Sequence, residues 1–184
     1  MNEKLNIDKH WTLFLDRDGV INEKRENDYV KNLDEFSFTN GALDAISRLS
    51  VVFGTIIIVT NQRGVGKGLM TELQLISIHN YLIKAVNQSG GRIDQIYYCT
   101  DILDSSGDRK PNIGMALKAK MYFPEIDFRK SIMIGDSMSD MEFGKRLSMH
   151  TIYISRIELE TELLKLVDYK CDSLFHATEH LINL

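Results

Sequence analysis

The chain has 184 residues, which is enough for one domain with a well-buried core and too few for two of ordinary size, so we expect a single domain over residues 1–184. Hydrophobic residues make up 43% and charged residues 26% of the chain, a composition that excludes a disordered protein. The 22 basic and 26 acidic side chains give a net charge of −4 without a basic run, which disfavours a nucleic-acid partner.

Strand-like apolar runs and helical patterns alternate along the chain. The predicted strands cover residues 11–15, 51–60, 93–99, 131–135 and 150–155. The predicted helices begin at Asn40 and Thr71, cover residues 113–121 and 138–149, and recur in the tail from Arg156. This alternation predicts a three-layer, Rossmann-like α/β fold with a mostly parallel sheet between helices. The segment between the first strand and the first helix is too short for a large cap domain.

The cysteine content and the first residues indicate where the protein works. Cys99 and Cys171 are the only cysteines, so the chain cannot build a disulfide framework, and they cannot by themselves complete a four-ligand zinc site. The first residues show neither a signal-peptide pattern nor an apolar span of about 20 residues. We therefore expect a cytoplasmic monomer with reduced thiols and no membrane partner.

The stretch FLDRDGVIN places two aspartates directly after the first predicted strand. Side chains two residues apart on an extended backbone point to the same side, so Asp16 and Asp18 are expected to project together beyond the strand end. A simple turn is the other interpretation, since Asp, Arg and Gly are common turn residues after a strand. Two adjacent carboxylates also suit a cation site or a phosphate acceptor.

Three more predicted strands end in polar side chains. These are Thr60, Asn61 and Arg63 after the second strand, Asp101, Asp104, Arg109 and Lys110 after the third, and Asp136 and Asp140 after the fourth. Ligands of open α/β sheets bind outside the carboxyl ends of the strands, so we expect these groups to gather at one edge of the sheet. Polar side chains after four separate strands indicate a ligand site more specifically than those after any one strand.

The carboxylates at these strand ends predict a cation. Asp16, Asp18 and Asp136 would repel one another, so a positive group is expected among them. Oxygen ligands without histidine or cysteine favour magnesium over zinc, and magnesium commonly takes a substrate phosphate as a further ligand. Thr60 and Lys110 would then bind phosphoryl oxygens. Capping of the following helix is the other interpretation of Asp136.

The same arrangement predicts a reaction. A carboxylate beside magnesium can attack phosphorus and form an aspartyl phosphate, which water then hydrolyses. Asp16, at the immediate end of the strand, is the expected nucleophile. Asp18 is expected to protonate the leaving oxygen and then to activate the water.

These residues resemble the motifs of the haloacid-dehalogenase-like (HAD) phosphatases. LDRDGVIN is similar to the first motif of that superfamily, IVTN to the second, RKP to the third and IGDSMSD to the fourth. The resemblance spans most of the chain and implies Asp16 as nucleophile, Asp18 as general acid and base, and Thr60 and Lys110 as phosphate ligands. The magnesium ligands that it implies are Asp16, the carbonyl of Asp18 and Asp136, supported by Asp140.

One branch of the superfamily is more similar than the others. DRDGVIN, TNQRGVGKG and RKPNIGM resemble segments of the D-glycero-D-manno-heptose 1,7-bisphosphate 7-phosphatases and the related histidinol-phosphatases. That resemblance implies that Asn61 and Arg109 contact the substrate beyond the reacting phosphate, with Arg63 as a further candidate. Asn61 could instead bond its own loop, and Arg109 could pair with Asp108.

The loop before RKP departs from this branch. Many of its members hold zinc there through a Cys-x-His pair and a later Cys-x-Cys pair, whereas CTDILDSSGDRKP keeps Cys99, has Asp101 in place of the histidine and lacks the later cysteines. We therefore expect no zinc and a loop held by turn residues within 104–107. The change weakens the heptose assignment and leaves the phosphatase assignment untouched.

The sequence thus predicts a magnesium-dependent phosphatase of a small phosphorylated metabolite, most specifically a heptose bisphosphate. Histidinol phosphate or another sugar phosphate is the alternative substrate. A polynucleotide-end phosphatase is disfavoured by the lack of a basic run. A non-catalytic binding protein is disfavoured because Asp16 and Asp18 are both present.

Overall fold

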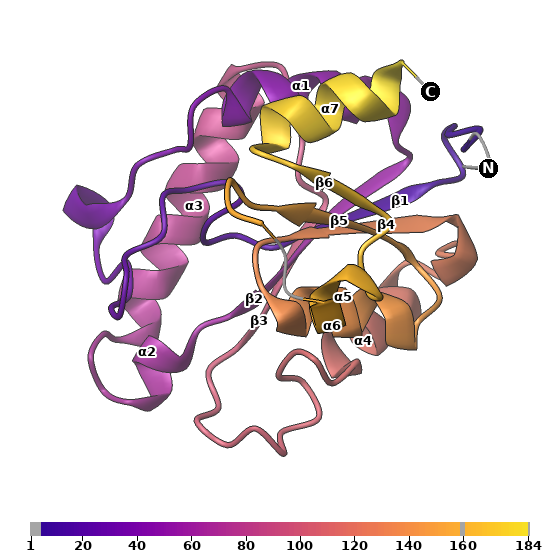
Figure 1. Ribbon diagram of the computed structural model, residues 1–184. Coiled ribbons are helices and arrows are strands. Elements are labelled where there is room, and N and C mark those ends of the chain that lie inside the picture. The colour runs from indigo at the N-terminus through magenta and orange to yellow at the C-terminus, as the bar shows by residue number, and fades with distance from the viewer. Residues whose placement is uncertain (1–4, 159–160, 184) are drawn as a thin grey trace.

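A computed structural model describes residues 5–158 and 161–183 of the protein. Within these residues, six parallel strands form one sheet in the order β3-β2-β1-β4-β5-β6. The strands are β1 Thr12–Leu15, β2 Thr55–Asn61, β3 Gln95–Cys99, β4 Ser131–Gly135, β5 His150–Ile154 and β6 Tyr169–Cys171. Because β1 lies between β2 and β4, the carboxyl ends of these three strands meet at one edge of the sheet (Figure 1).

Helices cover both faces of the sheet (Figure 1). They are α1 Ala42–Val52, α2 Arg63–Gly66, α3 Glu72–Gln88, α4 Gly114–Tyr122, α5 Met138–Arg146, α6 Thr161–Leu164 and α7 Leu174–Ile182, with short 3-10 helices η1 Leu33–Glu35 and η2 Phe128–Lys130. The apolar faces of α1, α3 and α7 pack on one side of the sheet, and those of α4 and α5 pack on the other. The predicted three-layer α/β fold is confirmed.

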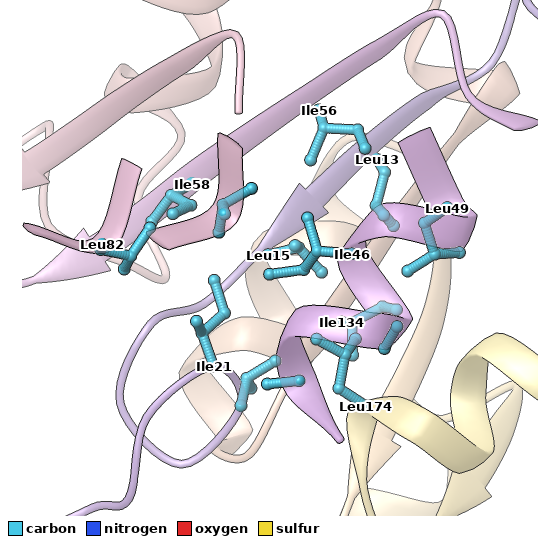
Figure 2. Close-up of a cluster of buried hydrophobic side chains, with 14 of the residues drawn as sticks. Leu13, Leu15, Ile21, Ile46, Leu49, Ile56, Ile58, Leu82, Ile134 and Leu174 are labelled. Carbon is cyan, nitrogen blue, oxygen red and sulfur yellow. The ribbon is translucent and has the colours of Figure 1, made fainter. Parts of the chain in front are cut away.

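The central strands are apolar on both faces, as expected for parallel strands between two helical layers. In β1, Leu13 and Leu15 join the hydrophobic cluster beneath α1, α3 and α7, whereas Phe14 joins the cluster beneath α4 and α5. Figure 2 shows the first cluster, in which Ile46 of α1 and Leu82 of α3 lie among the strand side chains. This packing fixes the strand ends from which the polar residues project.

The second predicted strand starts too early. β2 begins at Thr55 and not at residue 51, because Val51 and Val52 continue α1 to its end. The chain then turns at Gly54, where a Cβ atom would lie only 1.9 Å from the carbonyl oxygen of Lys9. A short apolar run suits a buried helix and a buried strand alike, so the run alone did not show this boundary.

Several other predicted elements also differ in their bounds. The strand predicted at 93–99 begins at Gln95, and the helix predicted at 138–149 ends at Arg146. The helix expected from Asn40 begins at Ala42, because Gly41 is its N-cap with a φ of 76°. The tail from Arg156 is not wholly helical, since β6 forms between α6 and α7 at the edge of the sheet. β6 has only three residues, too few to show a period. Residues 159 and 160 of the tail lie outside the described residues.

The connections next to the site contain little regular structure. Between β1 and α1 the chain forms η1 and the isolated bridges of Asn22 with Asp18 and Phe38, and Val30 and Phe36 of this connection pack into the core. Within the described residues neither this connection nor the one between β3 and α4 holds an inserted domain, in agreement with the predicted absence of a large cap. None of the described helices has the length and apolar character needed to cross a bilayer.

Candidate active site

A cavity of about 160 Å³ lies at the carboxyl ends of β1, β2 and β4. Seven of the nine predicted site residues line it: Asp16, Asp18, Thr60, Asn61, Lys110, Asp136 and Asp140. The other two, Arg63 and Arg109, lie outside the lining of the described cavity. The fold therefore brings together residues from four separate segments, as the strand-end argument predicts.

The positive group beside Asp16 and Asp140 is the ammonium of Lys110. This side chain is buried, and its Nζ lies 2.8 Å from Asp16 Oδ1 and 2.6 Å from Asp140 Oδ1. Nζ also donates to the carbonyl of Val59 at 2.7 Å. Burial alone would lower the pKa of Lys110, but the two carboxylates outweigh burial and raise this pKa above its ordinary value. Lys110 therefore stays charged across the physiological pH range.

Asp16 is held rigidly at the end of β1. Its backbone N–H donates to the carbonyl of Ile134 in β4 at 2.9 Å. Burial, reinforced by the nearby charges of Asp140 and Asp136 and opposed by Lys110, raises the pKa of Asp16 to about 7. A cation bound beside Asp16 would favour the ionised, nucleophilic form.

Three carboxylates of the site are close enough to share a cation. Asp16, Asp136 and Asp140 place carboxylate oxygens within 4.8 Å of one another. Lys24 donates to Asp136 Oδ2 at 2.7 Å, whereas Asp136 Oδ1 is buried without a hydrogen-bond partner among the described residues. An unpaired buried carboxylate oxygen in an acidic cluster is the type of ligand that magnesium takes. The residues present therefore fit a divalent cation.

The interpretation of Asp136 as a helix cap is wrong. Ser137 is the N-cap residue of α5. Oδ2 of Asp140 accepts the backbone N–H of Ser137 at 3.0 Å and its hydroxyl at 2.6 Å. Asp140 thus fixes the start of α5 with one oxygen while its other oxygen faces Lys110.

Two glycines leave room for the carboxylates. A Cβ atom at Gly135, the last residue of β4, would lie 2.3 Å from the Cβ of Asp140. Gly19 has a φ of 85°, and a Cβ atom there would lie 2.2 Å from Asp136 Oδ2. At both positions a side chain would have to displace a carboxylate of the site.

Replacing Gly135 by Ala is expected to lower the free energy of unfolding by about 1–3 kcal/mol, the usual cost of overpacking a core. Urea denaturation measures this change. Gly107→Ala is the matched control, because a Cβ atom at Gly107 meets nothing within 4 Å among the described residues. An unchanged urea midpoint for Gly135→Ala would show that Asp140 can move aside freely.

Asp18 is held by a separate set of donors. Its carboxylate accepts from Arg17 Nη2 at 2.9 and 3.0 Å, from Asn22 Nδ2 at 2.9 Å and from Gln62 Nε2 at 2.8 Å. Burial alone would raise the pKa of Asp18, but Arg17 and these hydrogen bonds hold it below its ordinary value. Asp18 is therefore ionised at neutral pH in the free protein. The three donor side chains fix the orientation of its carboxylate.

The end of β2 supplies the uncharged polar groups of the cavity. Thr60 Oγ1 accepts a hydrogen bond from Gln62 Nε2 at 2.8 Å. Asn61 does not bond its own loop but fastens β2 to the segment that carries Lys110. Its Nδ2 donates to the Lys110 carbonyl at 3.1 Å, and its Oδ1 accepts the Lys110 N–H at 3.0 Å.

Arg63 and Arg109 converge on one carboxylate outside the cavity. Arg109 Nε lies 3.1 Å from Asp104 Oδ1, and Arg63 Nη2 bonds the same oxygen. The alternative pairing of Arg109 with Asp108 is wrong, because Asp108 pairs with Lys118. The two arginines are thus held together next to the segment that carries Lys110.

The loop after β3 is held by its own polar groups. Ser106 donates to Asp101, and the Sγ of Cys99 lies 3.7 Å from Ser106 Oγ. Asn112 Nδ2 donates to the carbonyls of Asp104 at 3.0 Å and Ser106 at 2.9 Å. Of the turn residues expected within 104–107, the side chain of Ser106 and the carbonyls of Asp104 and Ser106 take part in these bonds, and their partners Cys99, Asp101 and Asn112 lie outside that range.

Sequence reasoning missed several residues of the site. Lys24 pairs with Asp136, and Arg17, Asn22 and Gln62 hold Asp18. Asn22 ends the motif LDRDGVIN, and Gln62 directly follows the motif IVTN. Their positions in or next to these motifs could have identified them as site residues. Lys24 lies in a polar loop that also contains Arg25 and Lys31, and no pattern distinguishes it from them.

Comparison with known proteins agrees with this geometry. The model of a family described as polynucleotide kinase 3 phosphatase matches residues 12–175. A D-glycero-alpha-D-manno-heptose-1,7-bisphosphate 7-phosphatase of Mycobacterium tuberculosis is 38% identical over 139 residues, which are 75% of this chain and 73% of the relative. A D-glycero-beta-D-manno-heptose-1,7-bisphosphate 7-phosphatase of Escherichia coli is 35% identical over 152 residues, 78% of each chain. This chain belongs to the HAD-like phosphatases.

A solved structure supports the place of this HAD-like phosphatase in the superfamily. The D,D-heptose 1,7-bisphosphate phosphatase from B. bronchiseptica, complexed with magnesium and phosphate, superimposes with a TM-score of 0.82. It is 28% identical, and the match covers 94% of this chain and 98% of that chain. The resemblance drawn from the motifs is thereby confirmed.

Proposed function

We propose that this HAD-like phosphatase is a magnesium-dependent hydrolase of phosphate monoesters that removes the 7-phosphate of D-glycero-D-manno-heptose 1,7-bisphosphate. The observation that supports it best is the group formed by Asp16, Lys110 and the unpaired oxygen of Asp136 at one cavity. One matching relative is named as a phosphatase of the alpha anomer and another as a phosphatase of the beta anomer. The proposal therefore covers both anomers of the substrate.

The first step uses Asp16 as the nucleophile. A carboxylate oxygen of Asp16 forms a bond to phosphorus while the ester P–O bond breaks, which leaves an aspartyl phosphate. Lys110, 2.8 Å from Asp16, and the Thr60 hydroxyl contact the phosphoryl oxygens and stabilise their charge. The leaving oxygen takes a proton from Asp18. A phosphate bound in the cavity adds negative charge beside Asp18, which raises the pKa of Asp18 toward the protonated form that this step needs.

The second step returns the enzyme to its starting state. Asp18, now ionised, accepts a proton from water, and the water oxygen forms a bond to phosphorus. The bond between phosphorus and Asp16 breaks, so inorganic phosphate is released and the carboxylate is restored. The three donors on Asp18 keep it in one orientation for both proton transfers.

The residues that would hold magnesium are Asp16, the carbonyl of Asp18 and Asp136. Magnesium would supply positive charge that neutralises the phosphate and the carboxylates during the reaction. Asp140 supports the site by fixing Lys110 and the start of α5.

The part of the substrate beyond the reacting phosphate would contact Asn61, Arg63 and Arg109. The two guanidinium groups already share one carboxylate, that of Asp104, and the same planar donors suit a phosphate. The Asp104 side chain is 85% exposed, so solvent screens its pairing with the two arginines. A doubly charged phosphate of the substrate can therefore take its place.

Two other substrate classes remain as alternatives. Histidinol phosphate or another sugar phosphate needs the same reacting centre and a different pocket around it. A polynucleotide end with a 3′-phosphate is suggested by the description of the matching family model. The net charge of −4 opposes that substrate, since nucleic-acid binding relies on basic surface.

The experiment that tests the proposal is phosphate release by the purified protein, with magnesium or with EDTA. The substrates are both anomers of heptose 1,7-bisphosphate, histidinol phosphate, glucose 6-phosphate, p-nitrophenyl phosphate and a 3′-phosphorylated DNA strand. We expect release to require magnesium, with kcat/KM for a heptose bisphosphate roughly 100-fold or more above that for histidinol phosphate and DNA.

The other outcomes are equally specific. A preference for histidinol phosphate or DNA would replace the substrate and keep the chemistry. Equal release in magnesium and in EDTA would contradict the role of the cation. No release from any of the substrates by the folded protein would contradict the hydrolase assignment for this class of compounds.

A further inference from the structure

Arg17 is the largest fully buried side chain among the described residues, although it is charged. It stands between Asp16 and Asp18 in the sequence, yet it does not line the described cavity. A guanidinium has only donors, so a buried one needs acceptors around it. Nη2 donates to both oxygens of Asp18, and Nη1 lies 3.2 Å from Nε2 of His79.

His79 reaches this place from the middle of α3. It is 5% exposed and lies on the face of the helix that carries the buried Leu75, Ile78 and Leu82. Because Arg17 can only donate, Nε2 of His79 must accept, and the ring proton is then on Nδ1. Burial and the neighbouring guanidinium lower the pKa of His79 to about 3, which agrees with a neutral ring.

We propose that His79 is a positioning residue, which orients the Asp18 carboxylate through Arg17. The guanidinium is planar and rigid, so an acceptor at Nη1 fixes the direction in which Nη2 presents its hydrogen bonds. Asn22 and Gln62 hold the same carboxylate directly. The inference rests on the proposed function, in which Asp18 carries the proton to the leaving oxygen.

A neutral acceptor suits this position better than a charged one. A carboxylate at position 79 would compete with Asp18 for the guanidinium, and an ammonium group would repel it. The imidazole satisfies Nη1 without adding a charge, so Arg17 keeps Asp18 as its ion-pair partner. An apolar side chain would pack on this helix face equally well but would leave Nη1 unpaired.

A loss of positioning affects the two substrates differently, whereas a loss of packing affects both alike. Protonation of the leaving oxygen matters for a sugar phosphate, whose alkoxide is strongly basic, and matters little for p-nitrophenyl phosphate. A positioned acid contributes about 10²–10⁴-fold. The quantity compared is kcat/KM, because it reports only the steps up to release of the leaving group and excludes the later hydrolysis, in which Asp18 acts on the same intermediate for both substrates. We expect His79→Leu to lower kcat/KM by roughly tenfold on the sugar phosphate and to stay within about twofold of the wild type on p-nitrophenyl phosphate.

Two further variants make the test specific. His79→Gln offers an amide oxygen that can accept from Arg17, and it should restore kcat/KM on the sugar phosphate to within about threefold of the wild type. Tyr98→Phe is the control, because the Tyr98 ring lies beside His79 while its hydroxyl bonds Glu72, away from Arg17. Tyr98→Phe should behave as the wild type on both substrates.

Kinetics on the two substrates decides the inference. A parallel loss of kcat/KM on both substrates by His79→Leu, or no loss of kcat/KM on either, would overturn the positioning role. If His79→Leu does not fold, His79→Asn replaces it under the same criterion, because its side chain is too short to reach Arg17. An inactive wild type would instead count against the proposed function, so the two failures are distinguishable.

Discussion

Replacing Asp16 by Asn is expected to lower kcat for phosphate release by roughly 10⁴-fold or more, the scale seen when a covalent nucleophile is removed. The amide cannot form the bond to phosphorus, and no other carboxylate stands at the immediate end of β1 within the described residues. Phosphate release from the preferred substrate, with magnesium in excess, measures the loss. Wild-type turnover by Asp16→Asn would show that another residue attacks phosphorus.

The same variant should remain folded. The pKa of Asp16 in the folded protein is about 7, above its ordinary value of 3.8. Folding therefore favours the protonated carboxyl: this stabilisation is complete below about pH 4 and is lost as the pH rises through 7. In EDTA at pH 8 we expect Asp16→Asn to have a Tm equal to or above that of the wild type, and at pH 5 this advantage should shrink. A variant that is unfolded at both pH values would make its inactivity uninformative about the chemistry.

Replacing Lys110 by Met is expected to have the second large effect, on stability as well as on turnover. The ammonium lies between two buried carboxylates, and removing one partner of a buried ion pair costs about 3–5 kcal/mol. Urea denaturation in EDTA measures this loss. The loss of a cation that contacts the phosphoryl oxygens should also lower kcat by about 10²–10³-fold.

Lys118→Met is the matched control for that experiment. Lys118 pairs with Asp108 on the surface and is 58% exposed, so its removal should change the free energy of unfolding by no more than about 0.5 kcal/mol. If Lys110→Met were as stable as Lys118→Met, the carboxylates Asp16 and Asp140 would not depend on Lys110 for their charge balance.

The site residues at the strand ends were predictable, because the parallel sheet alone determines where the strands end. Leu13 and Ile134 belong to the short, mostly apolar runs WTLFL and SIMIG, and Asp16 and Asp136 come immediately after those runs. Parallel strands put such residues at one edge whatever the details of packing. The edge strand β6 was not predictable in this way, because three residues carry no period and its neighbours are helical in pattern.

The contacts that orient the site were not predictable, because they join residues far apart in the chain. Arg17 and His79 are 62 positions apart, and a histidine on an apolar helix face gives no sign of its partner. The alternative for Arg109 named the sequence neighbour Asp108, whereas the loop turns back and presents Asp104. Side-chain pairing across loops depends on the loop conformation, and residue types alone do not determine it.

Trapping the covalent intermediate tests whether Asp16 is the nucleophile. Acid quenching during turnover, followed by borohydride reduction, converts an aspartyl phosphate to homoserine, which peptide mass spectrometry can locate. We predict homoserine at position 16 in the wild type and at no position in Asp16→Asn. Homoserine at another aspartate, or none at all in a mixture that is releasing phosphate, would contradict the assignment of Asp16 as the nucleophile.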